Sequence, residues 1–157
     1  MKKVIIYIIA ITAVLSCSKE NHNPDNPNGY SAEEKEVIDV LSGEWKQEGG
    51  TETLSFTPFG ETKEMSGNFE GSTFVGYFHG RSTRQFDYLG KEREKWDLYF
   101  YVNTSKKELD MYGVVDENKY SLVTTKKYDY VIVDKNTIRL HDQSLSLIST
   151  YNYTRTK

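Results

Sequence analysis

The feature that most restricts the fold is an alternation of apolar and polar residues with a period of two. It begins near residue 43 and is clearest at residues 95–103, where every second residue from Trp96 to Val102 is apolar. Successive side chains of a β-strand point to opposite faces of a sheet. Residues 95–103 are therefore expected to form a strand with one buried face.

The same reasoning predicts about eight or nine strands. Aromatic and β-branched residues favour strands, and the chain has twelve tyrosines and seven phenylalanines. Turn-forming residues separate the segments at short intervals, which is typical of hairpins. Unbroken sequential hairpins favour an all-β, antiparallel up-and-down β-barrel over a β-sandwich. The predicted strands are residues 43–47, 51–59, 69–79, 82–89, 95–103, 108–115, 120–134, 137–142 and 147–156.

One short helix is predicted at residues 31–41, before the first strand. Ser31 can cap its N-terminus, and Glu34, three residues later, can complete a capping box. Val37, Ile38 and Leu41 form an apolar stripe that would pack on the barrel. Further along, four glycines indicate β-bulges or a bend in the barrel, because no phosphate-binding motif accompanies them. They are Gly67, Gly71, Gly76 and Gly80.

The first thirty residues are not expected to belong to the barrel. Lys2 and Lys3 precede an apolar run at residues 4–15, which is too short to span a bilayer and fits the core of a cleaved signal peptide. Residues 18–30 contain no aliphatic residue, which is typical of a flexible linker. His22 lies in this linker, where solvation is favoured over metal binding.

The segment Val14-Leu15-Ser16-Cys17 resembles the lipobox of bacterial lipoproteins, although Leu15 is bulkier than usual. The resemblance implies cleavage before Cys17, acylation of this cysteine by groups such as palmitate, and a lipid anchor in the outer membrane. An ordinary signal peptide would instead leave the only cysteine of the chain as an unpaired thiol in an oxidising compartment. Lys19-Glu20 weakly resembles a surface-export signal, so the periplasmic face and the cell surface both stay open.

These observations predict three parts: a signal peptide at residues 1–16, a lipidated cysteine and linker at residues 17–30, and a single domain at residues 31–157. Within the domain, Gly43-Glu44-Trp45 follows the predicted helix directly. This arrangement resembles the N-terminal signature of lipocalins and of small bacterial lipocalin-like lipoproteins.

The lipocalin resemblance implies that Trp45 closes one end of the barrel and that an arginine of the last strand lies across its indole. Arg155 is the expected arginine, and Arg139 is the second choice. Such a cation–π contact contributes about 1 kcal/mol. Tyr128-Asp129-Tyr130 is similar to the central Thr-Asp-Tyr motif of the family, with tyrosine in place of threonine. In another β-fold, Trp45 would simply be a buried core residue.

Composition and motifs disfavour several function classes. The formal net charge of −3 gives no electrostatic footprint for nucleic acid. No serine has the Gly-x-Ser-x-Gly context, and His79 and His141 lack the spacing of metal ligands, so neither a metal nor a cofactor is expected. A hydrolase would need two carboxylates that face each other about 5–9 Å apart. The candidates lie near the two clearest strands: Glu92, Glu94, Asp97 and Asp110. Residues 92–95 alternate in charge, which favours a solvated hairpin over a catalytic pair.

A non-enzymatic binding module is the favoured interpretation, in a monomer held at the membrane by its lipid. A small apolar or amphipathic ligand could enter the barrel, lined by Trp96, Phe100, Leu109 and Met111. The same side chains could instead fill the interior completely. The alternative is an exposed aromatic face that binds a glycan or a protein, formed by Tyr99, Tyr101, Tyr112 and Tyr130.

Overall fold

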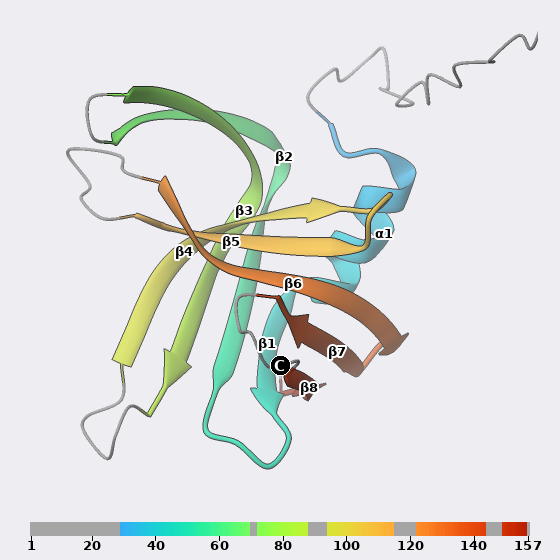
Figure 1. Ribbon diagram of the computed structural model, residues 1–157. Helices are drawn as coiled ribbons and strands as arrows, with labels where there is room; N and C mark the ends of the chain where they lie inside the picture. Colours follow the sequence, from blue (N-terminus) through green and yellow to red (C-terminus); the bar gives the residue numbers. More distant parts are fainter. Residues whose placement is uncertain (1–28, 70–71, 88–93, 115–121, 144–148, 157) are drawn as a thin grey trace, which may run out of the picture.

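The computed structural model describes residues 29–69, 72–87, 94–114, 122–143 and 149–156. The predicted signal peptide, Cys17, His22, Gly71 and Glu92 therefore lie outside the described residues. The described chain forms a closed antiparallel β-barrel of eight strands with one short helix (Figure 1). The elements are α1 (Ala32–Leu41), β1 (Gly43–Gln47), β2 (Thr53–Phe69), β3 (Ser72–Phe86), β4 (Glu94–Asn103), β5 (Glu108–Val114), β6 (Leu122–Asp134), β7 (Thr137–Asp142) and β8 (Ser149–Arg155).

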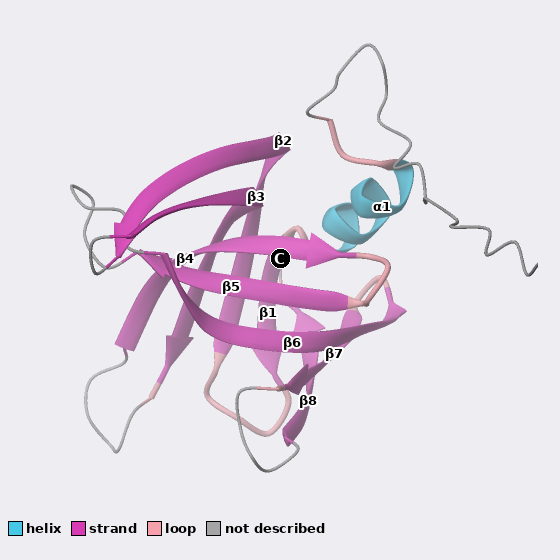
Figure 2. Ribbon diagram, turned by 45° about the horizontal axis from the view of Figure 1, so that its top comes forward, coloured by secondary structure: helices cyan, strands magenta, loops and turns pink. Residues whose placement is uncertain are grey.

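Each strand pairs with the next along the chain, and β8 returns to pair with β1. In the register that closes the barrel, Trp45 of β1 lies beside Leu54 of β2 on one side and Arg155 of β8 on the other. This connectivity confirms the predicted lipocalin-like up-and-down barrel and excludes a sandwich. Viewed from a second direction, α1 lies at one end of the barrel, near the connection between β4 and β5 (Figure 2).

Strands β2 and β3 are longer than the alternation predicts. Residues 60–68 were expected to separate two strands, but β2 runs through them to Phe69. They are mostly polar or glycine, so they lack the period-two pattern of a half-buried strand. The register shifts where Pro58 pairs with Gly80 and Lys63 pairs with Phe78. Residues 59–62 therefore form a wide bulge opposite residue 79.

Gly80 lies at this bulge because no larger residue fits there. A Cβ atom at Gly80 would lie 2.4 Å from Cε1 of Phe100 and 2.5 Å from the carbonyl oxygen of Thr57. The Phe100 ring thus occupies the space beside the Gly80 backbone. A glycine in a strand interior marks such a close approach, as the sequence indicated for this position.

The end of the barrel beside α1 is closed by Trp45 and Arg155. Trp45 is fully buried, and its indole Nε1 donates to the carbonyl oxygen of Leu41, 2.7 Å away. The guanidinium of Arg155 lies 4.6 Å from the Trp45 ring centroid and donates to the carbonyl oxygens of Val40 and Ser42. Arg155 thereby satisfies carbonyls that the C-terminus of α1 leaves without helical partners. Arg139 instead donates to the side chain of Asn152.

The N-terminus of α1 has the predicted capping box. The Glu34 backbone donates to the Ser31 hydroxyl, and the Glu34 carboxylate accepts from the Ser31 backbone. Ile38 and Leu41 on the inner side of α1 are buried in the apolar core. The helix therefore covers one end of the barrel.

Candidate functional site

Charged side chains lie inside the barrel, where the strand pattern places core residues. Arg84 of β3 is in register with the core residue Leu54 of β2 and with Trp96 of β4, so it projects inward with them. Its side chain is 13% exposed, and that of its partner Glu52 is 10% exposed. β1 starts beside α1 and leads, through a turn, to Glu52, so these charges lie at the end of the barrel away from α1.

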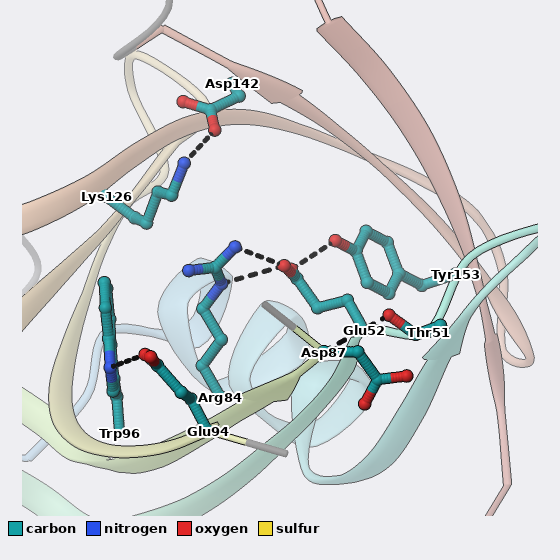
Figure 3. A network of polar contacts seen from close by, with 9 residues as sticks. All are labelled: Thr51, Glu52, Arg84, Asp87, Glu94, Trp96, Lys126, Asp142 and Tyr153. Atoms are coloured by element: carbon teal, nitrogen blue, oxygen red, sulfur yellow. Dashed lines mark hydrogen bonds and ion pairs between the residues drawn. The ribbon is translucent and has the colours of Figure 1, made fainter. Parts of the chain in front are cut away.

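Glu52 is the acceptor at the centre of this site (Figure 3). Arg84 donates to its carboxylate through Nε at 2.8 Å and through Nη2. The hydroxyl of Tyr153 donates to the other carboxylate oxygen at 2.6 Å. Burial and the Glu52 charge raise the pKa of Tyr153, so its phenol stays a donor. Although burial lowers the pKa of Arg84, its hydrogen bond to Glu52 and the Glu52 charge raise it overall.

A second ion pair joins Lys126 of β6 to Asp142 of β7. Lys126 is in register with Met111, and Asp142 with Tyr128, both of which are core residues. Figure 3 shows the Lys126 side chain directed into the same interior as Arg84. Together the two pairs supply two cations and two anions, which we call the charged layer: Glu52, Arg84, Lys126 and Asp142. A buried ion pair is a costly arrangement that gives little net stability.

The aromatic rings of Phe86 and Trp96 border the charged layer at the end of the barrel away from α1, which we call the rim. The Trp96 and Phe86 rings meet edge to face at 5.1 Å, and the Arg84 guanidinium lies 4.1 Å from the Phe86 centroid and 5.3 Å from that of Trp96. Trp96 is 37% exposed, and its indole donates to Glu94 at 3.2 Å. The rim therefore offers an accessible aromatic surface next to buried charges.

Ser82 lies next to Arg84 on the inner face of β3, one step deeper in the barrel. It is in register with Phe56 on one side and Leu98 on the other, both of which are buried. Its hydroxyl oxygen is itself buried and has no hydrogen-bond partner among the described residues. A buried polar group without a partner is rare in native proteins and calls for an explanation.

The residues predicted to line a ligand cavity fall into two environments. Phe100, Leu109 and Met111 are completely buried and belong to the core cluster, whereas Trp96 lies at the rim. The charged layer was not predicted from the sequence. Inward-facing Arg84 and Lys126 follow no apolar alternation, and a charged residue in a strand is ordinarily assigned to the solvent face.

Two of the four tyrosines predicted to form an exposed face are buried, and Tyr101 and Tyr112 are only partly exposed. Tyr99 is 8% exposed and Tyr130 is 6% exposed. Tyr99 lies on the outer face of β4, but the rings of Phe59 and Phe78 from the long β2–β3 hairpin contact it. Tyr130 belongs to the core cluster, on the same face of β6 as Tyr128.

The other residues with catalytic potential are dispersed in the described part of the chain. Asp97 makes an exposed ion pair with Lys95 at 3.4 Å. Asp110 accepts from the Tyr112 hydroxyl at 3.4 Å, and burial raises the pKa of Asp110. No group of three metal-ligating side chains is found among the described residues. These contacts identify no second site as well defined as the charged layer.

His79 is buried between α1 and the barrel wall. Its Nδ1 accepts a hydrogen bond from the Val102 backbone at 3.2 Å, where β3 no longer pairs with β4. Its Nε2 lies 3.7 Å from a carboxylate oxygen of Glu34. The rings of Tyr30 and Tyr101 pack on it at 5.3 and 4.8 Å. His79 therefore takes a structural place in the barrel wall, whereas His141 is hydrogen-bonded to Thr150 at the surface.

Burial lowers the pKa of His79 below its usual value of 6.5, and the charge of Glu34 only partly opposes this. The unfolded chain thus binds a proton at a higher pH than the folded chain. The contribution of His79 to stability is fully present above about pH 6.5 and is lost as the pH falls towards the lowered pKa. Urea denaturation at about pH 7.5 and about pH 5.5 should show this loss. This loss of stability at the lower pH should be smaller in His79→Gln and unchanged in His141→Gln. A loss in His79→Gln as large as in the parent chain would contradict the assignment of the pH dependence to His79.

No helix in the described part of the chain is both long and apolar enough to cross a membrane. In comparisons with known proteins, no family model, curated protein or solved structure matches this chain.

Proposed function

We propose that this protein is a lipid-anchored binding module of the bacterial cell envelope, without catalytic activity, that holds a small amphipathic molecule in the mouth of its barrel. The observation that carries the proposal is the charged layer behind the exposed rim residue Trp96. Ligand sites combine apolar and aromatic walls with a few placed polar groups. Because buried ion pairs give little net stability, folding alone is a poor reason to retain two of them at this mouth.

The two environments of the interior suggest how the ligand is oriented. Phe100, Leu109 and Met111 are packed in the core, so the ligand is held nearer the rim. Its apolar part would lie against Trp96 and Phe86, and its polar group would point towards Ser82 and Arg84. The buried hydroxyl of Ser82 supports this placement, since a ligand polar group would provide its missing partner.

Binding is tested with N-phenyl-1-naphthylamine, a neutral amphipathic dye that fluoresces in apolar surroundings. We use the full chain with Cys17→Ser, so that no acyl group competes for the site. Ser82→Leu, which places a larger apolar side chain inside the mouth, is expected to weaken dye binding at least tenfold, about 1.4 kcal/mol. Thr83→Leu, at the neighbouring outward position, is the matched control and should bind as the parent does.

Circular dichroism and the melting temperature establish that both variants are folded. Equal affinity of folded Ser82→Leu and Thr83→Leu would contradict a ligand site inside the barrel. So would a parent chain that does not bind the dye.

The lipid anchor rests on Cys17 and on the apolar segment that precedes it. Mass spectrometry of the mature protein should find acyl groups on this cysteine. The Cys17→Ser variant should move from the membrane fraction to the soluble fraction, since it cannot be acylated and each buried methylene contributes about 0.8 kcal/mol to anchoring. A Cys17→Ser protein that stays in the outer membrane would contradict the anchor.

A further inference from the structure

We propose that the polar group of the bound molecule carries no net charge: a hydroxyl, an amide or an ester rather than a carboxylate, phosphate or ammonium. This inference rests on the proposed function, because it specifies the chemistry of the ligand at the same mouth. It follows from the charge balance of the described interior. The charged layer contains two cations and two anions, and each cation is already in contact with an anion.

The positive charge of Arg84 is already neutralised by Glu52. Its Nε and Nη2 both donate to Glu52, and Glu52 also accepts the Tyr153 hydroxyl. An anionic ligand that took Arg84 would leave the Glu52 carboxylate buried without its cation. A buried charge that loses its partner is strongly unfavourable. The arrangement therefore opposes an acidic ligand although it contains an arginine.

The second ion pair leads to the same conclusion. Asp142 is almost completely buried, with 3% of its side chain exposed, and Lys126 is its cation. A ligand anion on Lys126 would compete with Asp142 for this cation, and a ligand cation on Asp142 would compete with Lys126. At the rim, Glu94 adds a further negative charge beside Trp96, which also disfavours an anion.

Ser82 supplies the neutral partner that such a ligand needs. Its hydroxyl can both donate and accept, it is buried, and it has no partner in the described part of the chain. The phenols of Tyr128 and Tyr153 are also uncharged, because burial raises the pKa of each above its usual value. Hydrogen-bonding groups without charge are therefore the ones that a ligand can engage without breaking an ion pair.

The test compares two dyes that share one skeleton and differ in charge. N-phenyl-1-naphthylamine is neutral, and 8-anilino-1-naphthalenesulfonate adds a sulfonate to the same N-phenylnaphthylamine. With the full-length Cys17→Ser chain, the neutral dye is expected to bind at least tenfold more tightly. Glu52→Gln removes one negative charge from the layer and is expected to raise the affinity for the sulfonate dye at least tenfold. The ratio of the two affinities should therefore shift towards the sulfonate dye.

Asp97→Asn removes one negative charge from the outer surface and is the matched control, which should leave both affinities unchanged. Asp142→Asn, at the second ion pair, should act like Glu52→Gln and provides a second variant if Glu52→Gln does not fold. Equal or tighter binding of the sulfonate dye to the parent chain would overturn the inference and leave the proposed function standing. Failure of the folded chain to bind either dye would overturn the proposed function itself.

Discussion

Replacing Trp45 with alanine is expected to lower the free energy of unfolding by about 3–5 kcal/mol, the range for truncation of a buried tryptophan. Trp45 is fully buried at the end of the barrel next to α1. The change removes its packing, the hydrogen bond to Leu41 and the contact with Arg155. Because Arg155 also holds the C-terminus of α1, loss of the indole should loosen the attachment of the helix to the barrel.

Urea denaturation measures this loss, and Trp96→Ala is the matched control. Both variants remove an indole, but Trp96 is partly exposed at the rim and lies outside the core cluster. The stability loss in Trp96→Ala should therefore be clearly smaller. Trp45→Phe should fall between the two, since it keeps an aromatic ring in the core. Equal losses for Trp45→Ala and Trp96→Ala would contradict the closing role assigned to Trp45.

Replacing Glu52 with leucine is expected to cost about 3–5 kcal/mol of stability, because it leaves the Arg84 guanidinium buried without a counter-charge. It also removes the acceptor of the Tyr153 hydroxyl. The double variant Glu52→Leu/Arg84→Met replaces both charges with apolar side chains of similar size. It is expected to recover most of the loss, since a buried ion pair and an apolar pair often give similar stability.

A double-mutant cycle by urea denaturation, with Arg84→Met as the other single variant, measures the coupling between the two residues. A double variant near parental stability would indicate that the ion pair is retained for what it does at the mouth. If the double variant loses as much free energy of unfolding as the two single variants together, neither loss depends on the partner charge. That result would contradict the main reason for assigning a binding role to the charged layer.

Strands with one buried face could be predicted closely from the sequence. The prediction of residues 137–142 coincides with β7, and that of residues 95–103 differs from β4 by one residue. The helix was predicted because Ser31 and Glu34 carry a specific capping pattern, which the structure confirms. In these segments local pattern and tertiary packing favour the same structure.

The bulge in β2 and the charged layer could not be predicted, because they depend on contacts between segments that are distant in the sequence. The bulge after Pro58 lies where the pairing of β3 with β4 ends, and the polar residues of β2 there do not alternate. The charged layer depends on partners far apart in sequence. Glu52, which directly precedes β2, accepts hydrogen bonds from Arg84 of β3 and from Tyr153 of β8. No local sequence pattern predicts that an inward-facing arginine will form an ion pair with a carboxylate, so the residues of the candidate site could not be predicted.

The position of α1 also determines which end of the barrel the proposed tether would join. The described chain enters the barrel through Tyr30 and α1, at the end closed by Trp45 and Arg155. The charged layer lies at the opposite end of the same barrel. The proposed tether on Cys17 would thus join the closed end, and the mouth would lie at the end of the barrel opposite the attachment point. The tether would therefore not obstruct the entry of a ligand into the mouth.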